Sequence, residues 1–301
     1  MSTSQFQGLL TNFRRIQVCS FDAGGGNVLS HITRELSLET SFLVSGPSLS
    51  IYSGVYPNFE NQNTESMLPD IDLLIASTGW QSDFEFNKMH EALERGITVI
   101  AVLDHWVNYR ERFKRNNEEI LPTYFVAVDD YAKSLLEDEY PGSQIFLTEN
   151  VFLKRSVVNI KNRRRNLISF LYDFTFIGEP LSRSITNRLW DEFDALRNLF
   201  ETLSRLDLYT ARILIKPHPS ENPEKYKPAI PAIFKNVQID SGASIIEVLA
   251  NSKKVVGCNS MALYLSDLSS IPTYTSLPEG VKPQVPISNV VPINSLRRID
   301  L

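Results

Sequence analysis

The chain has 301 residues, of which 43% are hydrophobic and 22% are charged, and its formal net charge is −5 at pH 7. That length allows two domains of ordinary size, and the apolar fraction is that of a globular protein. The acidic balance argues against a dedicated nucleic-acid binder, and no apolar run approaches the roughly 20 residues that span a bilayer.

The N-terminal segment lacks the layout of a signal peptide, because its basic residues follow the short apolar stretch instead of preceding it. The two cysteines, Cys19 and Cys258, end apolar runs and are expected to be buried free thiols. Without a disulfide framework, a cytoplasmic protein is favoured.

In the first half of the chain, short β-rich apolar runs alternate with helical patterns. The run ITVIAVLD is almost continuously apolar, which is typical of a strand buried on both faces of a parallel sheet. The patterns predict strands over 16–21, 41–45, 72–77, 97–104, 123–130 and 144–148, and helices over 27–36, 84–95 and 131–137.

A basic segment, 154–165, interrupts the alternation and is interpreted as the interdomain linker. Its run Lys161-Asn162-Arg163-Arg164-Arg165 fits a solvated linker or a peripheral contact with anionic lipid headgroups. Beyond it, the patterns predict strands over 166–174, 212–219, 237–240, 254–259 and 272–276, and helices over 182–206, 244–250 and 260–268.

The fold class that follows is α/β, with two doubly wound, Rossmann-like domains that face a cleft. We assign residues 1–155 to an N-terminal Rossmann-like domain and 166–301 to a C-terminal Rossmann-like domain. Ligands of such sheets bind outside the carboxyl ends of the strands, so the polar turns that follow strands are the candidate site.

Three polar turns follow strands or precede helices in the second half. Lys216-Pro217-His218-Pro219-Ser220 follows the strand ILI, and its prolines hold the imidazole at the edge of the sheet. Ser244 and Ser260 are each expected to cap a helix whose N-terminal N–H groups can hold an anion. A structural turn and plain helix caps are the alternative interpretations. The candidate ligand-binding residues are His218, Pro219, Ser220, Ser244, Asn259 and Ser260, with Glu179 after the first strand of this domain.

The stretch ILIKPHPS…VQIDSGASIIEVLANSKKVVGCNSMALYLSDLSSIPTY resembles the C-terminal domain of GT-B glycosyltransferases that carry an HP motif and a Ser/Thr-Ser motif. Bacterial sialyltransferases, Kdo transferases and capsule polymerases of this kind use CMP-activated sugars. The resemblance, over residues 166–280, implies that His218 and Asn259-Ser260 hold the donor's phosphate and cytidine. It makes the candidate residues above donor-binding residues, 166–301 the donor domain and 1–155 the acceptor domain. It departs from the family at Leu265, where many GT-B proteins carry a ribose-binding glutamate; Asp267 lies two residues further on.

In the first half, Asp22 ends the first strand and is followed by Gly24-Gly25-Gly26-Asn27. Glycines let the backbone turn sharply and approach a ligand, and Asn27 is the expected helix cap. HP-motif sialyltransferases use an acidic residue of the N-terminal domain as general base, and the resemblance gives that role to Asp22. A turn-forming Asp bonded to nearby N–H groups is the alternative. Gly25, Gly26 and Asn27 are predicted to bind the acceptor.

Two further loops follow strands of this domain, Ser77–Gln81 and Asp104–Phe113. The second is dense in aromatic and charged residues, which stack on sugar rings and pair with carboxylates. Asp104 is the second candidate for the catalytic base, and a helix start capped by Asp104 is the alternative. The predicted acceptor-binding residues of these loops are Trp80, His105, Trp106 and Arg110.

No Cys/His cluster has zinc spacing, and Asp129-Asp130 is interpreted as a helix start, so no metal and no cofactor are predicted. The leading hypothesis is a metal-independent glycosyltransferase that moves a sugar, CMP-linked and acidic by preference, onto a glycan or lipid-linked glycan in surface polysaccharide synthesis. The alternatives are a transferase of CDP-linked alcohols, a sugar-nucleotide epimerase or hydrolase, and a non-catalytic nucleotide-sugar-binding subunit.

Overall fold

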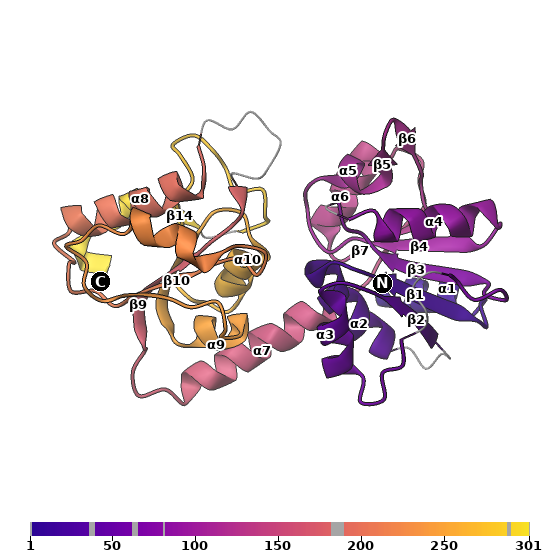
Figure 1. Cartoon of the computed structure of the whole chain (residues 1–301), viewed down its shortest axis with the longest axis horizontal. Coiled ribbons are helices and arrows are strands. Elements are labelled where there is room, and N and C mark those ends of the chain that lie inside the picture. The colour runs from indigo at the N-terminus through magenta and orange to yellow at the C-terminus, as the bar shows by residue number, and fades with distance from the viewer. Residues whose placement is uncertain are drawn as a thin grey trace. The chain divides into compact units, whose positions relative to one another are not determined.

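The computed structural model describes residues 2–35, 40–61, 66–80, 82–181, 190–287 and 290–300. Contacts within the chain divide it into two compact units, unit 1 (Met1–Lys154) and unit 2 (Arg155–Leu301). In Figure 1 unit 1 runs from indigo to magenta, and most of unit 2 is drawn in orange to yellow.

Unit 1 is built on a six-stranded sheet in the order β2-β1-β3-β4-β7-β8, in which all neighbouring strands are parallel. The strands are β1 (Ile16–Ser20), β2 (Thr40–Val44), β3 (Leu73–Ser77), β4 (Thr98–Val102), β7 (Tyr124–Ala127) and β8 (Ile145–Leu147). The helices are α1 (Ser2–Leu10), α2 (Ala23–Arg34), α3 (Ser48–Val55), α4 (Phe84–Glu94), α5 (Tyr109–Phe113) and α6 (Asp130–Glu139), with a small hairpin of β5 (Lys114–Arg115) and β6 (Glu118–Glu119).

Unit 2 repeats this plan with the strand order β11-β10-β9-β12-β13-β14, again parallel throughout. Its strands are β9 (Tyr172–Ile177), β10 (Ile213–Lys216), β11 (Val237–Ile239), β12 (Ser252–Gly257), β13 (Thr273–Thr275) and β14 (Val291–Pro292). Its helices are α8 (Glu192–Arg205), α9 (Ile245–Ala250), α10 (Met261–Leu268) and the 3₁₀ segments η2 (Pro223–Ala229), η3 (Ile293–Ser295) and η4 (Arg298–Asp300). Helix α7 (Val151–Arg165) runs from unit 1 into unit 2.

The strand order reverses once in each sheet, and that point positions the candidate site. In unit 1 the chain leaves β1 toward β2 and returns to place β3 on the other side of β1. In unit 2 it leaves β9 toward β10 and returns to place β12 on the other side of β9. The residues that follow β1 and β3, and those that follow β9 and β12, therefore lie at the switch points where such sheets bind ligands.

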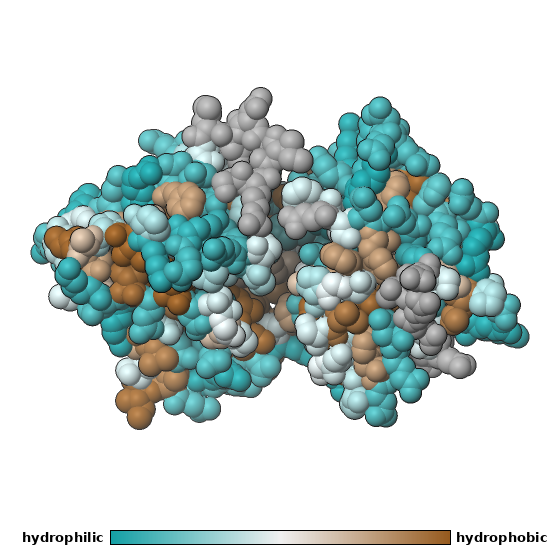
Figure 2. All heavy atoms as spheres, viewed as in Figure 1, coloured by the Kyte–Doolittle hydropathy of each residue, from teal (hydrophilic) through white to brown (hydrophobic). Residues whose placement is uncertain are grey.

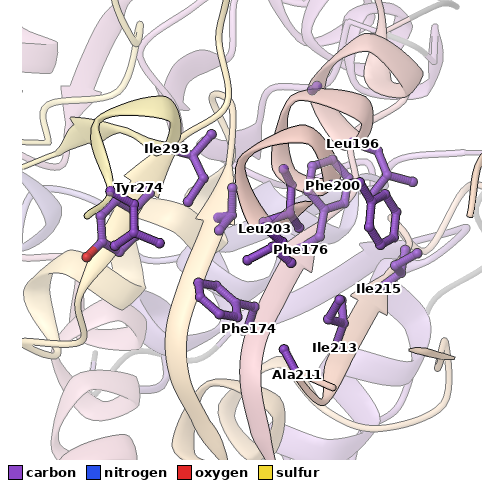
Figure 3. Packing of buried hydrophobic residues seen from close by; sticks show 14 of the residues in the cluster. Phe174, Phe176, Leu196, Phe200, Leu203, Ala211, Ile213, Ile215, Tyr274 and Ile293 are labelled. Carbon is purple, nitrogen blue, oxygen red and sulfur yellow. The ribbon is translucent and has the colours of Figure 1, made fainter. Parts of the chain in front are cut away.

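The cores sit where the helices cover the sheets, and the surface seen in Figure 2 is mostly hydrophilic. In unit 2, Phe174 and Phe176 of β9 pack with Phe200 of α8 and Ile213 and Ile215 of β10 (Figure 3). Burial of these large side chains supplies most of the driving force that holds α8 on the sheet. Within the described residues, no helix has the length and apolarity needed to cross a bilayer.

Several predicted elements differ from the observed ones. The glycine run expected as a turn is the first turn of α2, which begins at Ala23 because Asp22 caps it by accepting the Gly24 N–H. Asn27 is therefore not the cap; its side-chain amide donates to the Ala23 carbonyl inside the helix.

The first strand of unit 2 also begins later than predicted. Asn166 and Leu167 turn onto the end of α7, and β9 starts at Tyr172, which brings Phe174 and Phe176 into the core. The segment predicted as a linker, 154–165, is helical because it contains no Gly or Pro and continues helix α7, which Asn150 caps. Of the helix expected over 182–206, residues 182–189 lie outside the described residues, as do Leu36 of the predicted 27–36 helix and Gln81.

Candidate active site

Asp22 stands at the carboxyl end of β1, at the switch point of the unit 1 sheet. Its Oδ2 accepts the Gly24 N–H at 3.1 Å, which fixes the carboxyl against the first turn of α2. Burial raises the pKa of Asp22, and the negative charge of Asp104 raises this pKa further. The structure thus combines a capping role with the raised pKa of a candidate base.

Asp104, the second candidate base, follows β4 and is 6% exposed. Its Oδ1 accepts a hydrogen bond of 2.7 Å from Arg112, whose guanidinium also donates to the hydroxyl and the carbonyl of Thr78. A Cβ added to Gly24 would lie 2.5 Å from Asp104 Oδ2 and 3.2 Å from Asp22 Oδ2. The two candidate carboxylates therefore both border the space next to the Gly24 Cα. The alternative interpretation, in which Asp104 caps a helix, is wrong, because α5 begins only at Tyr109.

Glu85 holds the loops that follow β1 and β3, next to this carboxylate pair. It is fully buried on α4 and accepts hydrogen bonds from Phe21 N (3.1 Å), Gly79 N (3.0 Å) and Ser77 Oγ (2.5 Å). Burial raises the pKa of Glu85, while these hydrogen bonds act in the opposite direction. Because Phe21 precedes Asp22 and Gly79 precedes Trp80, one side chain positions both loops.

The glycines of α2 serve close packing. Gly25 and Gly26 are buried, and a Cβ on Gly25 would lie 2.7 Å from the Cβ of Ser77. A Cβ on Gly26 would overlap the hydroxyl of Ser48, which donates to the Asp22 carbonyl at 2.8 Å. These contacts account for glycine at both positions through the approach of α2 to the sheet and α3. A contact of either backbone with an acceptor stays a prediction.

The predicted acceptor-binding residues of the loops after β3 and β4 differ in how far they are buried. Trp106 is buried, and its indole N–H donates to Asp129 at 2.9 Å, which favours a packing role. Trp80 is half-buried, and Arg110 is exposed and paired with Glu139. The remaining member, His105, has a buried Nδ1 with no hydrogen-bond partner among the described residues, and burial lowers the pKa of His105 to about 4. Its imidazole is therefore neutral at pH 7.

In unit 2, His218 lies in an exposed turn after β10. The backbone N–H of Ser220 donates to His218 Nδ1 at 3.2 Å, and the Ser220 hydroxyl lies 2.8 Å from the same nitrogen. Since Nδ1 acts as an acceptor, the neutral ring carries its proton on Nε2. Pro219 joins these two residues and is itself exposed. The turn therefore places the His218 imidazole at the carboxyl edge of the sheet.

A buried cluster of charged side chains holds the backbone of the His218 turn. Glu221 is 8% exposed and accepts the His218 backbone N–H at 2.9 Å and the Tyr226 hydroxyl at 3.0 Å. Lys225 pairs with both Glu221 and Glu192. The backbone of His218 is thus held by a carboxylate that is itself held by a lysine.

Glu179 follows β9 at the switch point of the unit 2 sheet. It is 8% exposed, and its Oε1 accepts backbone N–H groups from Cys258 (3.2 Å) and Asn259 (2.7 Å). The carboxylate therefore fixes the loop between β12 and α10. This geometry favours a positioning role for Glu179 over direct contact with a donor.

The two serine turns cap helices as the sequence predicted. Ser244 accepts the Glu247 N–H at the start of α9, and Ser260 accepts the Leu263 N–H at the start of α10. Asn259 is half-buried, and its Oδ1 accepts the Gln284 N–H at 2.8 Å. Leu265 is 1% exposed in α10, so the position that departs from the GT-B pattern faces the core.

Three buried charged residues that organise these loops were not predicted from the sequence: Glu85, Arg112 and Glu221. A signal for Glu85 was present, because Glu85, Met89 and Ala92 have the i, i+4, i+7 spacing of an apolar helix face, and all three are buried. Arg112 lies in the five-residue helix α5, which is too short to show such periodicity, and Glu221 lies in an irregular turn. No cluster of three His, Cys, Asp or Glu side chains with the form of a metal site occurs within the described ranges.

No protein-family model matches the chain, and no curated protein matches its sequence. Solved structures do match its fold. The UDP-GlcNAc 2-epimerase from Methanocaldococcus jannaschii matches with a TM-score of 0.61 at 14% identity, over 93% of this chain and 89% of that one. The UDP-GlcNAc 2-epimerase from Neisseria meningitidis, solved with UDP-GlcNAc bound, gives 0.57 at 12% identity over 83% and 78%. A glycosyltransferase from Rickettsia africae gives 0.54 at 13% identity over 88% and 79%.

At these identities the likeness concerns the fold. It shows that the predicted class is right: an α/β chain of two Rossmann-like units with parallel sheets, as in GT-B glycosyltransferases and the UDP-GlcNAc 2-epimerases.

Proposed function

We propose that this chain is a glycosyltransferase that moves a sugar from a nucleotide-activated donor to a glycan acceptor. The observation that carries the proposal is the carboxylate pair of Asp22, at the switch point of the unit 1 sheet, and Asp104, which follows β4. A carboxylate whose pKa is raised is a stronger base than a solvated one, and such a base suits the deprotonation of an attacking hydroxyl.

Unit 2 is the proposed donor site. His218 Nε2–H would donate to a phosphate oxygen of the donor, and Asn259 and Ser260 would contact the nucleotide at the start of α10. Glu221 and Glu179 would position these loops through the backbone contacts described above. The HP turn favours a CMP-linked acidic sugar and a role in surface polysaccharide synthesis, whereas UDP-GlcNAc, the ligand of the Neisseria meningitidis epimerase structure, is the competing donor type.

In the proposed reaction, the acceptor oxygen forms a bond to the anomeric carbon while the bond from that carbon to the donor's phosphate oxygen breaks. The acceptor's proton passes to Asp22, and the nucleotide leaves with its charge stabilised by His218. Asp104 stays paired with Arg112 and acts by keeping the pKa of Asp22 high. Trp80, His105 and Arg110 are the proposed acceptor contacts, with the neutral His105 suited to a sugar hydroxyl.

The test is transfer of a labelled sugar from nucleotide donors to glycan acceptors by the wild-type chain and Asp22→Asn. We expect the substitution to lower kcat by about 10²- to 10⁴-fold, the range of general-base catalysis, and to leave the dissociation constant of the nucleotide unchanged. Asp83→Asn is the matched control, because Asp83 is a solvent-exposed aspartate of the same unit. Full activity of Asp22→Asn would remove the base assignment.

A sugar-nucleotide epimerase is the second candidate, because two adjacent carboxylates can remove and return a proton on a carbon. An epimerase of this type would exchange a carbon-bound hydrogen of the sugar with solvent. Incubation with UDP-GlcNAc in deuterated water separates the two functions. Deuterium in the recovered sugar nucleotide would favour the epimerase, and its absence together with acceptor-dependent release of nucleotide would favour the transferase.

A further inference from the structure

The loop between α7 and β9 is an exposed apolar tip on a rigid base. Ile168 is fully exposed, and Leu171 is 55% exposed. Figure 2 shows hydrophobic side chains protruding at the lower left, where Figure 1 places the segment between α7 and β9. Two large aliphatic side chains in one short loop differ from the singly scattered exposed residues that need no explanation.

The base of this loop is fixed by hydrogen bonds. The Arg164 guanidinium lies 4.4 Å from the centre of the Phe170 ring and donates to the carbonyls of Leu249, Ala250 and Ser252. Arg212 donates to the Phe170 carbonyl at 2.9 Å. The chain on either side of Ile168 is therefore held in place while the side chain itself faces solvent.

Positive charge surrounds the tip. Helix α7 carries no Asp or Glu from Val151 to Arg165, although the whole chain has a net charge of −5. Arg163 and Arg165 are exposed and Lys161 is half-buried in the last turns of α7, next to the loop. The tip thus combines an aliphatic point with a cationic collar, which we define as Lys161, Arg163 and Arg165.

We propose that this tip, Ile168 and Leu171 with their cationic collar, docks unit 2 on an anionic lipid surface. Aliphatic side chains enter the boundary between headgroups and acyl chains, and arginines pair with the headgroup phosphates. A nucleic-acid strand fits less well, because the exposed tip has aliphatic side chains where base stacking needs rings, and Phe170 is covered by Arg164. The inference is independent of the proposed enzymatic activity.

The position of the tip in the fold leaves the candidate donor site accessible. The loop precedes β9 and so lies at the amino end of the parallel sheet of unit 2. His218, Glu179 and Asn259 follow strands and lie at the carboxyl end. Lipid binding and nucleotide binding should therefore not compete.

The test is flotation of the full chain with vesicles of phosphatidylcholine alone and of phosphatidylcholine mixed with phosphatidylglycerol. We expect binding to the mixed vesicles only, weakened at high salt. Arg163→Gln with Arg165→Gln should reduce the partition coefficient roughly 30-fold, from about 1 kcal/mol for each charge near the surface. Ile168→Ser with Leu171→Ser should reduce it about tenfold or more.

Matched controls are Ile299→Ser, an exposed isoleucine elsewhere on unit 2, and Lys114→Gln with Lys235→Gln, two exposed lysines. These should leave partition unchanged, and all variants should keep the wild-type melting temperature. The proposal is overturned by equal binding to neutral vesicles, by no binding, or by equal losses in the controls. It is also overturned if Ile168→Ser with Leu171→Ser converts a dimer to a monomer in sedimentation velocity without vesicles, because the tip would then be a self-association surface.

Discussion

Both units place their candidate functional residues at the carboxyl ends of parallel strands, but the two units differ in how far these residues are exposed to solvent. Unit 1 buries Asp104, Glu85 and Arg112 and keeps Asp22 largely out of solvent, so that burial raises the pKa of both Asp22 and Glu85. Unit 2 buries its supporting charges and leaves His218 exposed. A low-dielectric edge suits a group that must change protonation, and an exposed donor suits a charged ligand that arrives from water.

Both units use a buried glutamate as a clamp for backbone N–H groups. Glu85 holds the loops after β1 and β3, and Glu179 holds the loop after β12. A carboxylate can accept several hydrogen bonds from different segments, so one side chain can fix two loops whose own sequences are irregular. Each glutamate can be substituted separately, and we expect the loss of stability to be confined to the unit that carries the substitution.

The largest effect on stability is expected for Glu85→Ala. Loss of the carboxylate leaves the N–H groups of Phe21 and Gly79 buried without an acceptor, which should lower the free energy of unfolding by about 3 kcal/mol or more. Urea unfolding monitored by circular dichroism measures this. Glu94→Ala, on the exposed side of the same helix, is the control, and an equal loss there would contradict the clamp.

The same residue makes a pH prediction. Because burial raises the pKa of Glu85, the folded protein holds this proton more tightly than the unfolded chain. The resulting stabilisation is fully present below the unfolded pKa and is lost as the pH rises through the folded pKa. Glu85→Gln should therefore flatten the dependence of unfolding free energy on pH across that interval, and an unchanged slope would contradict the assignment.

Next in size is the effect of His218→Ala on nucleotide affinity. A hydrogen bond to a charged phosphate contributes about 1.5–3 kcal/mol, so the dissociation constant should rise roughly 10- to 150-fold. Calorimetric titration measures it, with His90→Ala in unit 1 as the control. A dissociation constant that is unchanged in His218→Ala would place the phosphate elsewhere.

A smaller effect is expected from the glycines of α2. Gly26→Ala places a methyl group against Ser48 and should lower the free energy of unfolding by about 1–3 kcal/mol. Gly8→Ala, in a helix position with open space around it, should raise that free energy by up to about 1 kcal/mol. Thermal melts of the two variants should therefore shift in opposite directions, and a shared direction would contradict the packing account.

The smallest change is a shift along the pH axis. If Asp22 is the base, kcat/KM should fall as the pH drops through its raised pKa, since the protonated carboxyl accepts no proton. Asp104→Asn removes a neighbouring negative charge and should move this limb to lower pH. It also leaves Arg112 buried without its carboxylate, so the pH profile must be taken below the lowered melting temperature.

The fold class could be predicted from the sequence, because the alternation of short apolar runs with helical patterns is visible without knowledge of tertiary contacts. All of the strands expected in unit 1 are present, and only their ends differ. The prediction failed where tertiary contacts decide: the glycine run reads as a turn but forms the first turn of α2, since Ser48 and Ser77 leave no space for side chains. The late start of β9 follows from the turn at Asn166 and Leu167, which no pattern of alternation predicts.

The candidate site was predictable in its outline only. Asp22 and Asp104 lie together because the ends of β1 and β4 belong to one sheet edge, which topology implies. The supporting charges were less predictable. Arg112 donates to the carbonyl of Thr78, which is distant in sequence, and Glu221 accepts the backbone N–H of His218 within an irregular turn. Trp106 was predicted to bind the acceptor because tryptophan stacks on sugar rings. In the structure it is buried, and its indole N–H donates to Asp129.

The most direct test of the contrast between the units is a calorimetric titration of CMP and UDP into the wild-type chain, Asp22→Asn and His218→Ala. We expect Asp22→Asn to bind the preferred nucleotide as tightly as the wild type, and His218→Ala to bind it at least about tenfold more weakly. The reverse outcome, with binding lost in Asp22→Asn and retained in His218→Ala, would contradict the assignment of donor binding to unit 2 and of the catalytic base to unit 1.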